Sequence, residues 1–453
     1  MRYIPVTCEQ REAMLRAVGV ASVDDLFADI PAAVRLESGL DLHEGMTELE
    51  LSEHLKALAA RNRHADELVG FLGAGCYDHH LPAVVDAVIS KPSFFTAYTP
   101  YQPEVSQGTL QAIYEFQTMI AELTGMDVAN ASMYDGATAA VEAALMAARV
   151  TKREKVIASG ALHPEWRSTL ATYAEAGTIV AVECGSASGR TDVEGLAALV
   201  DDDTAAVVVS QPSFYGTLED LEAIAAVAHE HGALLVVAAN PILLGVLEPP
   251  STFGADVVVG EGQPLGLPMS YGGPGFGFFA CRDAYLRQMP GRVVGRTVDV
   301  DDRVGYVLTM QTREQHIRRE KATSNICSNH ALAALAGSVY LAAVGSEGLG
   351  GIGRSCIAKA HYLRERLLAS GRFTAVWDAP FAHEFTLRYQ GDVRDMQAAL
   401  LDRGYLAGYA LASVERADPG LPDAEASSLV MFAVTERRTK AQMDAFLQAV
   451  VSL

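Results

Sequence analysis

Six short runs of apolar and β-branched residues constrain the fold of this chain more than any other feature. Helical stretches such as 220–232 separate some of them. Strands that are apolar along their whole length are typical of a mostly parallel sheet buried on both faces. We therefore predict one large α/β domain at 91–340. The runs are KVIAS (155–159), GTIVAVE (177–183), TAAVVVSQ (204–211), ALLVVAA (233–239), ADVVVGE (255–261) and GFGFFAC (275–281).

Two further regions flank this domain. A chain of 453 residues exceeds the roughly 250–300 at which one core stops growing, so several lobes are expected. Residues 1–90 carry helical patterns, including a capping box in which Gln10 follows Thr7, and we predict a helical arm there. Helices mixed with strands such as HEFTLRY predict a smaller α+β domain at 341–453.

The composition excludes several classes of partner. Acidic residues number 56 against 35 basic ones, and no basic run occurs, so no nucleic-acid partner is expected. No window of about 18 uncharged apolar residues predicts a membrane span, and the start has no apolar secretion signal. We expect a cytoplasmic protein. The six cysteines are scattered without a CxxC pair, which predicts reduced, structural thiols and no metal site.

Four segments are long and distinctive. They are GAGCYDHHLP (73–82), FFTAYTPYQPEVSQGTLQAIYEFQTMIAELTGMDVANAS (94–132), YDGATAAVEAA (134–144) and QTREQHIRREKATSNICSN (311–329). Together they resemble the P-protein family of the glycine cleavage system, which exists as one long chain or as two homologous subunits. The match is to the first half, or subunit 1. This resemblance implies the fold of type I pyridoxal-phosphate (PLP) enzymes: a large α/β domain with a mostly parallel sheet, a helical N-terminal arm and a smaller α+β C-terminal domain.

The resemblance also implies an activity. In that family PLP accepts electrons as glycine loses CO2, and the remaining aminomethyl group passes to the lipoyl arm of H-protein. The implied partners are therefore a homologous subunit 2, in a heterotetramer of two copies each, together with lipoylated H-protein and glycine.

The lysine that holds PLP in such folds is absent where we expect it. Alignment of the Gly-rich runs in ADVVVGEGQPLGLPMSYGGPGFG places Gln263 at the lysine position, and an amide cannot form the imine. No lysine lies between Lys155 and Lys321, and the preceding strand offers Asn240 where an Asp normally pairs with the cofactor ring. We therefore predict that the partner subunit binds PLP and that this chain completes the active site.

Two polar segments are candidates for that contribution. The proline-stiffened loop 96–107 concentrates phenols and amides, although such tyrosines also occur as ordinary packing. Segment 311–329 is rich in Arg and polar residues, which also suits a solvated helix face. Given the resemblance, we favour contacts at the active site or subunit interface by Thr96, Tyr98, Thr99, Tyr101, Gln102, Gln107, Arg313, His316 and Lys321.

Four other positions have weaker signals. His79 and His80 are acid–base candidates or a solvated pair in a turn, and no third ligand is evident beside them. Asp135 opens a helix and predicts a capped N-terminus rather than a phosphate cup. His163 follows a strand where this fold often keeps a ring against PLP, and without the lysine we expect a structural role.

Two rival hypotheses remain open. The chain could be a scaffold or regulatory subunit without a share in catalysis. It could also be an independent PLP enzyme that uses a displaced lysine such as Lys321, although this lysine lies far past the expected position.

Overall fold

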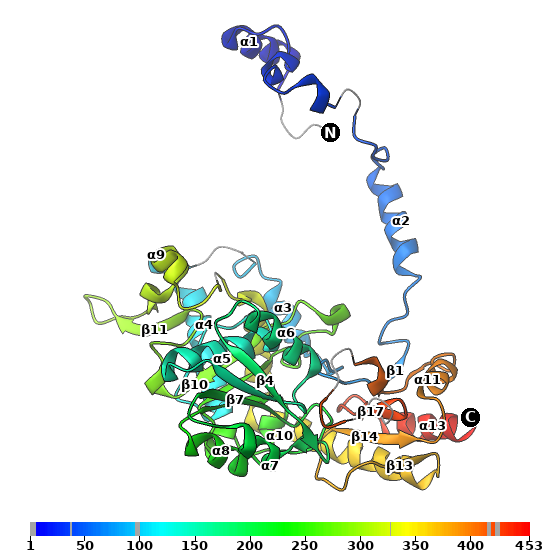
Figure 1. Cartoon of the computed structure of the whole chain (residues 1–453). Helices are drawn as coiled ribbons and strands as arrows, with labels where there is room; N and C mark the ends of the chain where they lie inside the picture. Colours follow the sequence, from blue (N-terminus) through cyan, green and yellow to red (C-terminus); the bar gives the residue numbers. More distant parts are fainter. Residues whose placement is uncertain (1–5, 37–38, 96–99, 327, 415–417, 422–425) are drawn as a thin grey trace. The chain divides into compact units, whose positions relative to one another are not determined.

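The computed structural model describes residues 6–36, 39–95, 100–326, 328–414, 418–421 and 426–453 (Figure 1). The chain divides into two compact units, Met1–Arg63 and His64–Leu453. In the first unit, α1 (Cys8–Val18) and α2 (Glu48–Ala59) each begin with a capping box, Thr7 with Gln10 and Thr47 with Glu50. None of the described residues in this unit is buried, so its apolar side chains form no core of their own.

A seven-stranded sheet is the centre of the second unit. Its order is β2-β10-β9-β8-β7-β3-β4, and only β10 runs against the others. This confirms the predicted mostly parallel sheet and places the apolar runs in it. The strands are β2 (Val128–Ala129), β3 (Lys155–Ser159), β4 (Val180–Cys184), β7 (Thr204–Gln211), β8 (Leu234–Ala239), β9 (Val257–Glu261) and β10 (Gly277–Cys281).

Alternate residues of each strand enter two separate cores, one on each face of the sheet. Val207 and Val209 of β7 pack with one set of helices, whereas Val208 packs with the other. The first face is covered by α4 (Gln107–Thr124), α7 (Val193–Leu199), α8 (Leu221–Glu230) and the start of α10 (Ala331–Ala369). The second face is covered by α5 (Gly136–Thr151) and α6 (Pro164–Ala174).

A second, smaller sheet is antiparallel, in the order β13-β14-β17-β16. It packs against two helices and the end of α10. A short parallel pair lies beside it and joins β1 (Val69–Gly70) to β15 (Tyr405–Leu406). The elements are β13 (Phe373–Ala375), β14 (Glu384–Tyr389), α11 (Val393–Leu401), β16 (Tyr409–Ala410), β17 (Leu429–Ala433) and α13 (Lys440–Val451).

The predicted domain limits at 90 and 340 stay predictions, but two observations bear on them. Phe71 belongs to the core of the smaller sheet, although it lies within the predicted arm. The helix α10 passes through residue 340: Tyr340 packs under the large sheet, and Leu363 and Leu367 pack under the small one.

The length and composition of α10 also satisfy the usual test for a membrane-spanning helix. The sequence analysis predicted no such span. Core helices of soluble proteins pass the same test, and the buried residues of α10 supply apolar contacts to both sheets.

Several smaller elements position the site. The helix α3 (Ala83–Ile89) follows the 73–82 segment, and the hairpin of β11 (Val293–Val298) and β12 (Val304–Thr309) packs on α4. After β12, the 311–329 segment forms short helical turns that include α9 (Gln315–Arg318).

Candidate active site

The carboxyl ends of β7, β8 and β9 are where open parallel sheets usually bind their ligands. A cavity of ≈ 80 Å³ lies there, lined by Ser210, Asn240 and Glu261 from the sheet and by Tyr77 and Glu384 from elsewhere in the chain. This volume accommodates several water molecules.

Gln263, the residue at the expected lysine position, is only 6 % exposed and is fully engaged with backbone. Its oxygen accepts a hydrogen bond from Tyr77 N at 3.0 Å, and its nitrogen donates to Tyr77 O at 3.0 Å and to Leu267 O at 2.9 Å. The amide therefore fastens the 73–78 loop over the end of β9. A lysine could not form this pattern, because an ammonium has no acceptor.

The N-terminus of α5, where a comparable fold would hold a phosphate, is already occupied by two carboxylates. Asp135 accepts from Thr138 N at 2.7 Å, which confirms the predicted cap. The Glu261 carboxylate accepts from Gly136 N and from Gln263 N, both at 3.0 Å. Burial raises the pKa of Glu261 to about 7, although these backbone N–H groups favour its charged form. Glu261 thus takes the place that an anionic ligand would need.

The 73–78 loop is held from its other side by Glu384 of β14. The carboxylate of Glu384 accepts from Tyr77 Oη at 2.6 Å and from Ala74 N at 2.9 Å. A Cβ added at Gly73 would collide with the same carboxylate, so only glycine allows the loop to approach so closely.

His163 also supports the loop. Its Nδ1 accepts from Glu165 N at 3.2 Å, so Nε2 carries the proton and donates to Ala74 O at 2.9 Å. Burial lowers the pKa of His163, which keeps the ring neutral. His163 therefore caps α6 and fixes the loop, in agreement with the structural role expected from the sequence.

PLP does not fit the residues that line this cavity. The lining residues include no lysine, and the Asn240 oxygen accepts from Ile242 N at 3.0 Å in its own turn. Glu261 covers the helix N-terminus, and the 73–78 loop covers the cavity. Lys321, the displaced lysine of the rival hypothesis, lies exposed in a short turn after α9.

Restoring the lysine alone should therefore fail to restore cofactor binding. We expect the variant Gln263→Lys to form no borohydride-reducible adduct with PLP, because the loop, Glu261 and Asn240 stay in place. Absorbance of the variant mixed with PLP, before and after reduction, measures this. A new stoichiometric adduct at position 263 would show that the lysine was the sole missing part.

Glu384 makes the stability of this closed site depend on pH. Burial raises its pKa to about 7, so between about pH 4.5 and 7 the folded chain keeps a proton that the unfolded chain has released. The stabilising contribution of this carboxyl is present below pH 4.5 and is lost as pH rises through 7.

We expect Glu384→Gln to raise the melting temperature at pH 8 by a few degrees, with a difference that vanishes near pH 4.5, since the full effect is about 3 kcal/mol. Thermal melts from pH 4.5 to 8.5 measure it, with exposed Glu347→Gln as control. Parallel curves for wild type and Glu384→Gln would contradict the raised pKa.

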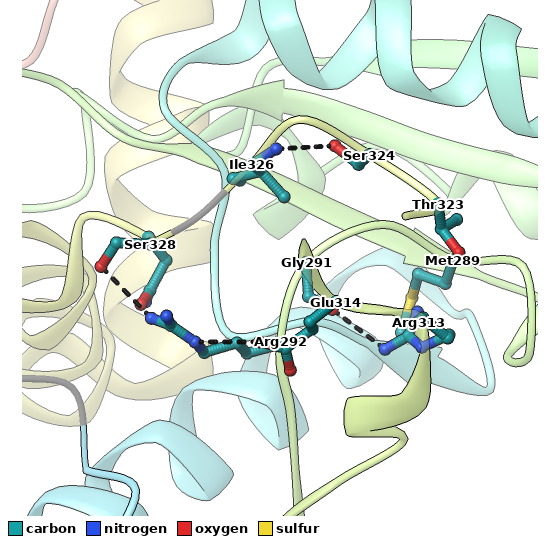
Figure 2. Close-up of a pocket in the computed structure, with 10 residues that line it drawn as sticks. Met289, Gly291, Arg292, Arg313, Glu314, Thr323, Ser324, Ile326 and Ser328 are labelled. Atoms are coloured by element: carbon teal, nitrogen blue, oxygen red, sulfur yellow. Dashed lines mark hydrogen bonds and ion pairs between the residues drawn. The ribbon is translucent and has the colours of Figure 1, made fainter. Parts of the chain in front are cut away.

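A second site lies where the two predicted polar segments meet. Arg292, just before β11, donates to Tyr101 Oη at 3.2 Å and to Ser328 Oγ at 3.2 Å, and its Nε lies 3.5 Å from a Glu314 oxygen. Figure 2 shows Arg292 stretched between Ser328 and Glu314. The guanidinium also lies 5.5 Å from the centre of the Tyr101 ring. Arg292 therefore joins loop 100–107 to segment 311–329.

Two predicted residues, Tyr101 and His316, belong to this cluster, and a third, Arg313, supports it. The His316 ring meets the Tyr101 ring edge-on at 5.4 Å between centroids, and its Nδ1 lies 3.7 Å from Glu314. Arg313 donates to Met310 O at 3.1 Å and to Gly291 O at 2.9 Å, so it shapes the loop that carries the cluster. We call Tyr101, Arg292, Glu314 and His316 the Arg292 cluster.

An apolar hollow of ≈ 630 Å³ adjoins the cluster. Phe94, Phe95, Phe116 and Leu267 line it together with the first turns of α10, and Arg292, Ser328 and Asn329 lie at its edge. Phe95 is 71 % exposed. An apolar hollow of this size with a few polar groups at one edge is typical of a binding site.

The other predicted residues are placed differently. The Gln107 amide bonds both ways to the backbone of Tyr306 and holds β12, which is a structural task. Gln102 and Lys321 are exposed. His79 and His80 lie apart from the cluster, against Glu436. Thr96, Tyr98 and Thr99 lie outside the described residues, and the roles of all these residues stay predictions.

Sequence reasoning missed Arg292, Glu314, Glu261 and Glu384. An arginine inside PGRVVGR carries no local signal, and Glu384 lies 310 positions from the loop that it binds. Glu261 did offer a signal, because a carboxylate at the carboxyl end of a buried parallel strand points at the usual ligand position.

The fold defines the class of protein. Solved type I PLP enzymes align over most of the chain: a glutamate decarboxylase from Lactobacillus brevis superposes with a TM-score of 0.68 at 15 % identity, covering 93 % of this chain and 95 % of its own. At that identity the likeness shows the fold alone, and this fold is the PLP-dependent type I architecture predicted from the sequence.

The family follows from closer relatives. The family model "Glycine cleavage system P-protein" matches residues 1–450. A relative from Geobacillus kaustophilus, "Probable glycine dehydrogenase (decarboxylating) subunit 1", is 51 % identical over 446 residues, 98 % of each chain. A relative of the same name from Anoxybacillus flavithermus is 48 % identical over 447 residues, 99 % of this chain and 98 % of the other.

A solved structure of "glycine decarboxylase (P-protein) of the glycine cleavage system, in inhibitor-bound form" superposes with a TM-score of 0.90 at 45 % identity, over 100 % of both chains. The chain belongs to the glycine cleavage system P-protein family, of the subunit 1 type. This confirms the resemblance identified from the sequence segments. The name of the relatives implies a partner subunit.

Proposed function

We propose that this chain is the subunit of a glycine-decarboxylating enzyme that holds no PLP of its own and completes the active site of its partner. The observation that supports this most is the contrast between its two sites. The position that a type I PLP enzyme uses for its cofactor is filled by Gln263, Glu261 and the 73–78 loop. The Arg292 cluster instead lies beside an open hollow.

The Arg292 cluster suits a contact with an anionic or polar group brought by another molecule. Arg292 is held in one orientation by Tyr101, Glu314 and Ser328. Arg292 is 5 % exposed and already faces Glu314, so its task is to position the cluster, whereas Tyr101 and His316 are exposed and can meet another molecule. The adjoining hollow is apolar, as an acyl chain such as the lipoyl arm would require.

The proposed assembly is a heterotetramer of two copies of each subunit in the cytoplasm. The partner subunit carries PLP, and lipoylated H-protein accepts the aminomethyl group. The first unit needs a contact outside itself, because its described residues do not bury Leu49, Leu51, Leu55 and Leu58. In the proposed assembly such apolar side chains have a surface to pack against.

Reconstitution tests this function. We expect neither subunit alone to catalyse glycine–bicarbonate exchange with H-protein, and the co-purified pair to do so. Size-exclusion chromatography of the pair should give one peak with the mass of two plus two chains. Exchange by the partner subunit alone at the rate of the pair would assign this chain the scaffold role. Subunits that separate at micromolar concentration would contradict the assembly.

A further inference from the structure

Three side chains that bind metals in other proteins meet in the interior, far from one another in sequence. His79 lies in the loop before α3, Cys356 lies inside α10, and Glu436 follows β17. His79 Nδ1 is 2.7 Å from Glu436 Oε2, and Cys356 Sγ is 3.5 Å from the same oxygen. The three ligand atoms all lie within 4.8 Å of one another. The sequence offered no third ligand near His79, and the fold supplies two.

The surroundings of these three residues are buried and incompletely paired. The His79 side chain is 1 % exposed and Cys356 is fully buried, whereas the Glu436 side chain is 16 % exposed and gives access from solvent. Among the described residues, no hydrogen-bond partner is present for His79 Nε2, Tyr340 Oη or either nitrogen of His383. His79 faces Glu436 through Nδ1, so an ion between the three residues would bind Nδ1 and would leave these unpaired atoms for buried water.

Glu436 is held firmly in its position. Its carboxylate accepts from His80 N at 2.6 Å, and its backbone oxygen accepts from Lys359 Nζ at 2.5 Å. These contacts hold the Glu436 carboxylate facing His79 and Cys356.

The chemistry of the three groups selects the ion. Thiolate, imidazole and carboxylate are the common ligands of Zn²⁺, at about 2.0–2.3 Å. One thiolate and one carboxylate balance the two charges of the ion, which is what a buried site needs. Three protein ligands leave a fourth position for water. Ligand atoms around such an ion lie roughly 3.3–3.8 Å apart. The His79–Glu436 contact must therefore open by somewhat less than 1 Å.

We propose that His79, Cys356 and Glu436 bind one zinc ion. When the ion binds, the Cys356 thiol loses its proton to solvent and one Zn–S bond forms, with no change of oxidation state. The ion would tie the 73–82 loop to α10 and to the end of β17, and so fix the loop that closes the cofactor position. The proposal does not depend on the proposed function, since it concerns this chain alone.

The test is zinc content and affinity of the full-length chain. After dialysis against zinc and then metal-free buffer, we expect one zinc per chain in the wild type by elemental analysis. Cobalt(II) added to the metal-free chain should give a thiolate-to-cobalt charge-transfer band. Loss of an outer-shell partner costs about 10–100-fold in metal affinity, so loss of a ligand in His79→Gln or Cys356→Ser should cost at least about 100-fold.

Matched controls come from the same chain. His80 is adjacent to His79 but exposed, and Cys184 is as buried as Cys356 but distant in the fold. His80→Gln and Cys184→Ser should keep one zinc and the cobalt band. Zinc should also raise the melting temperature of the wild type and of both controls, but of neither ligand variant.

Two results would overturn the proposal. One is a wild-type chain that holds no zinc and gives no thiolate–cobalt band, which would leave a hydrogen-bonded triad only. The other is retention of both signals in His79→Gln and Cys356→Ser. The wild-type spectrum decides the question even if a ligand variant fails to fold.

Discussion

Replacement of Asp78 by alanine should lower the melting temperature of the chain by about 4–6 °C. Asp78 is mostly buried and pairs with Arg437 and with Arg438 Nη2 at 2.6 Å. Arg438 is itself only 5 % exposed. Removal of one partner from a buried ion pair leaves the other charge uncompensated, at a cost of about 3–5 kcal/mol.

The matched control is Asp66→Ala. Asp66 also pairs with Arg437, at 3.3 Å, but its side chain is 78 % exposed, so its loss should change stability by less than about 0.5 kcal/mol. Thermal melts of the two variants at pH 7.5 make the comparison. Equal, small shifts would show that the 73–78 loop does not depend on its ion pairs with Arg437 and Arg438.

Replacement of Tyr101 by phenylalanine should lower glycine–bicarbonate exchange by the reconstituted enzyme about 100-fold or more. The change removes only the hydroxyl that accepts a hydrogen bond from Arg292 at 3.2 Å. Loss of one positioned contact at a reacting centre typically lowers the reaction rate by about this factor. The melting temperature and the subunit complex should stay unchanged, because the ring still packs against His316.

The control is Tyr405→Phe, which changes a half-buried tyrosine of β15 that packs on Phe446. This variant should keep full activity. Full activity in Tyr101→Phe as well would place the Arg292 cluster outside the active site and would favour the scaffold hypothesis.

The sequence predicted the large sheet well, because strands buried on both faces must be apolar throughout, and this pattern is local. It also indicated that Gln263 follows a strand, and the structure places Gln263 just after β9. That this is the lysine position stays a prediction. What Gln263 does there was beyond the sequence: its amide bonds to Tyr77, which lies 186 positions away.

The functional surface was predicted only in part, because its residues come from distant parts of the chain and meet only in the fold. Loop 96–107 and segment 311–329 were each identified from their polar residues, but the residue that joins them was not. Arg292 lies outside both segments and becomes informative only when the fold brings Tyr101 within 3.2 Å, across 191 positions. The sequence also did not predict that Cys356 and Glu436 lie close to His79, because neither is near it in sequence.

In the proposed enzyme, this chain completes an active site whose cofactor its partner holds. Borohydride reduction of the PLP-loaded complex, followed by peptide mapping of both subunits, tests it most directly. We expect one PLP adduct on a lysine of the partner subunit and none on any lysine of this chain. A stoichiometric adduct on this chain, at Lys321 or at any other lysine, would show that this chain holds PLP itself.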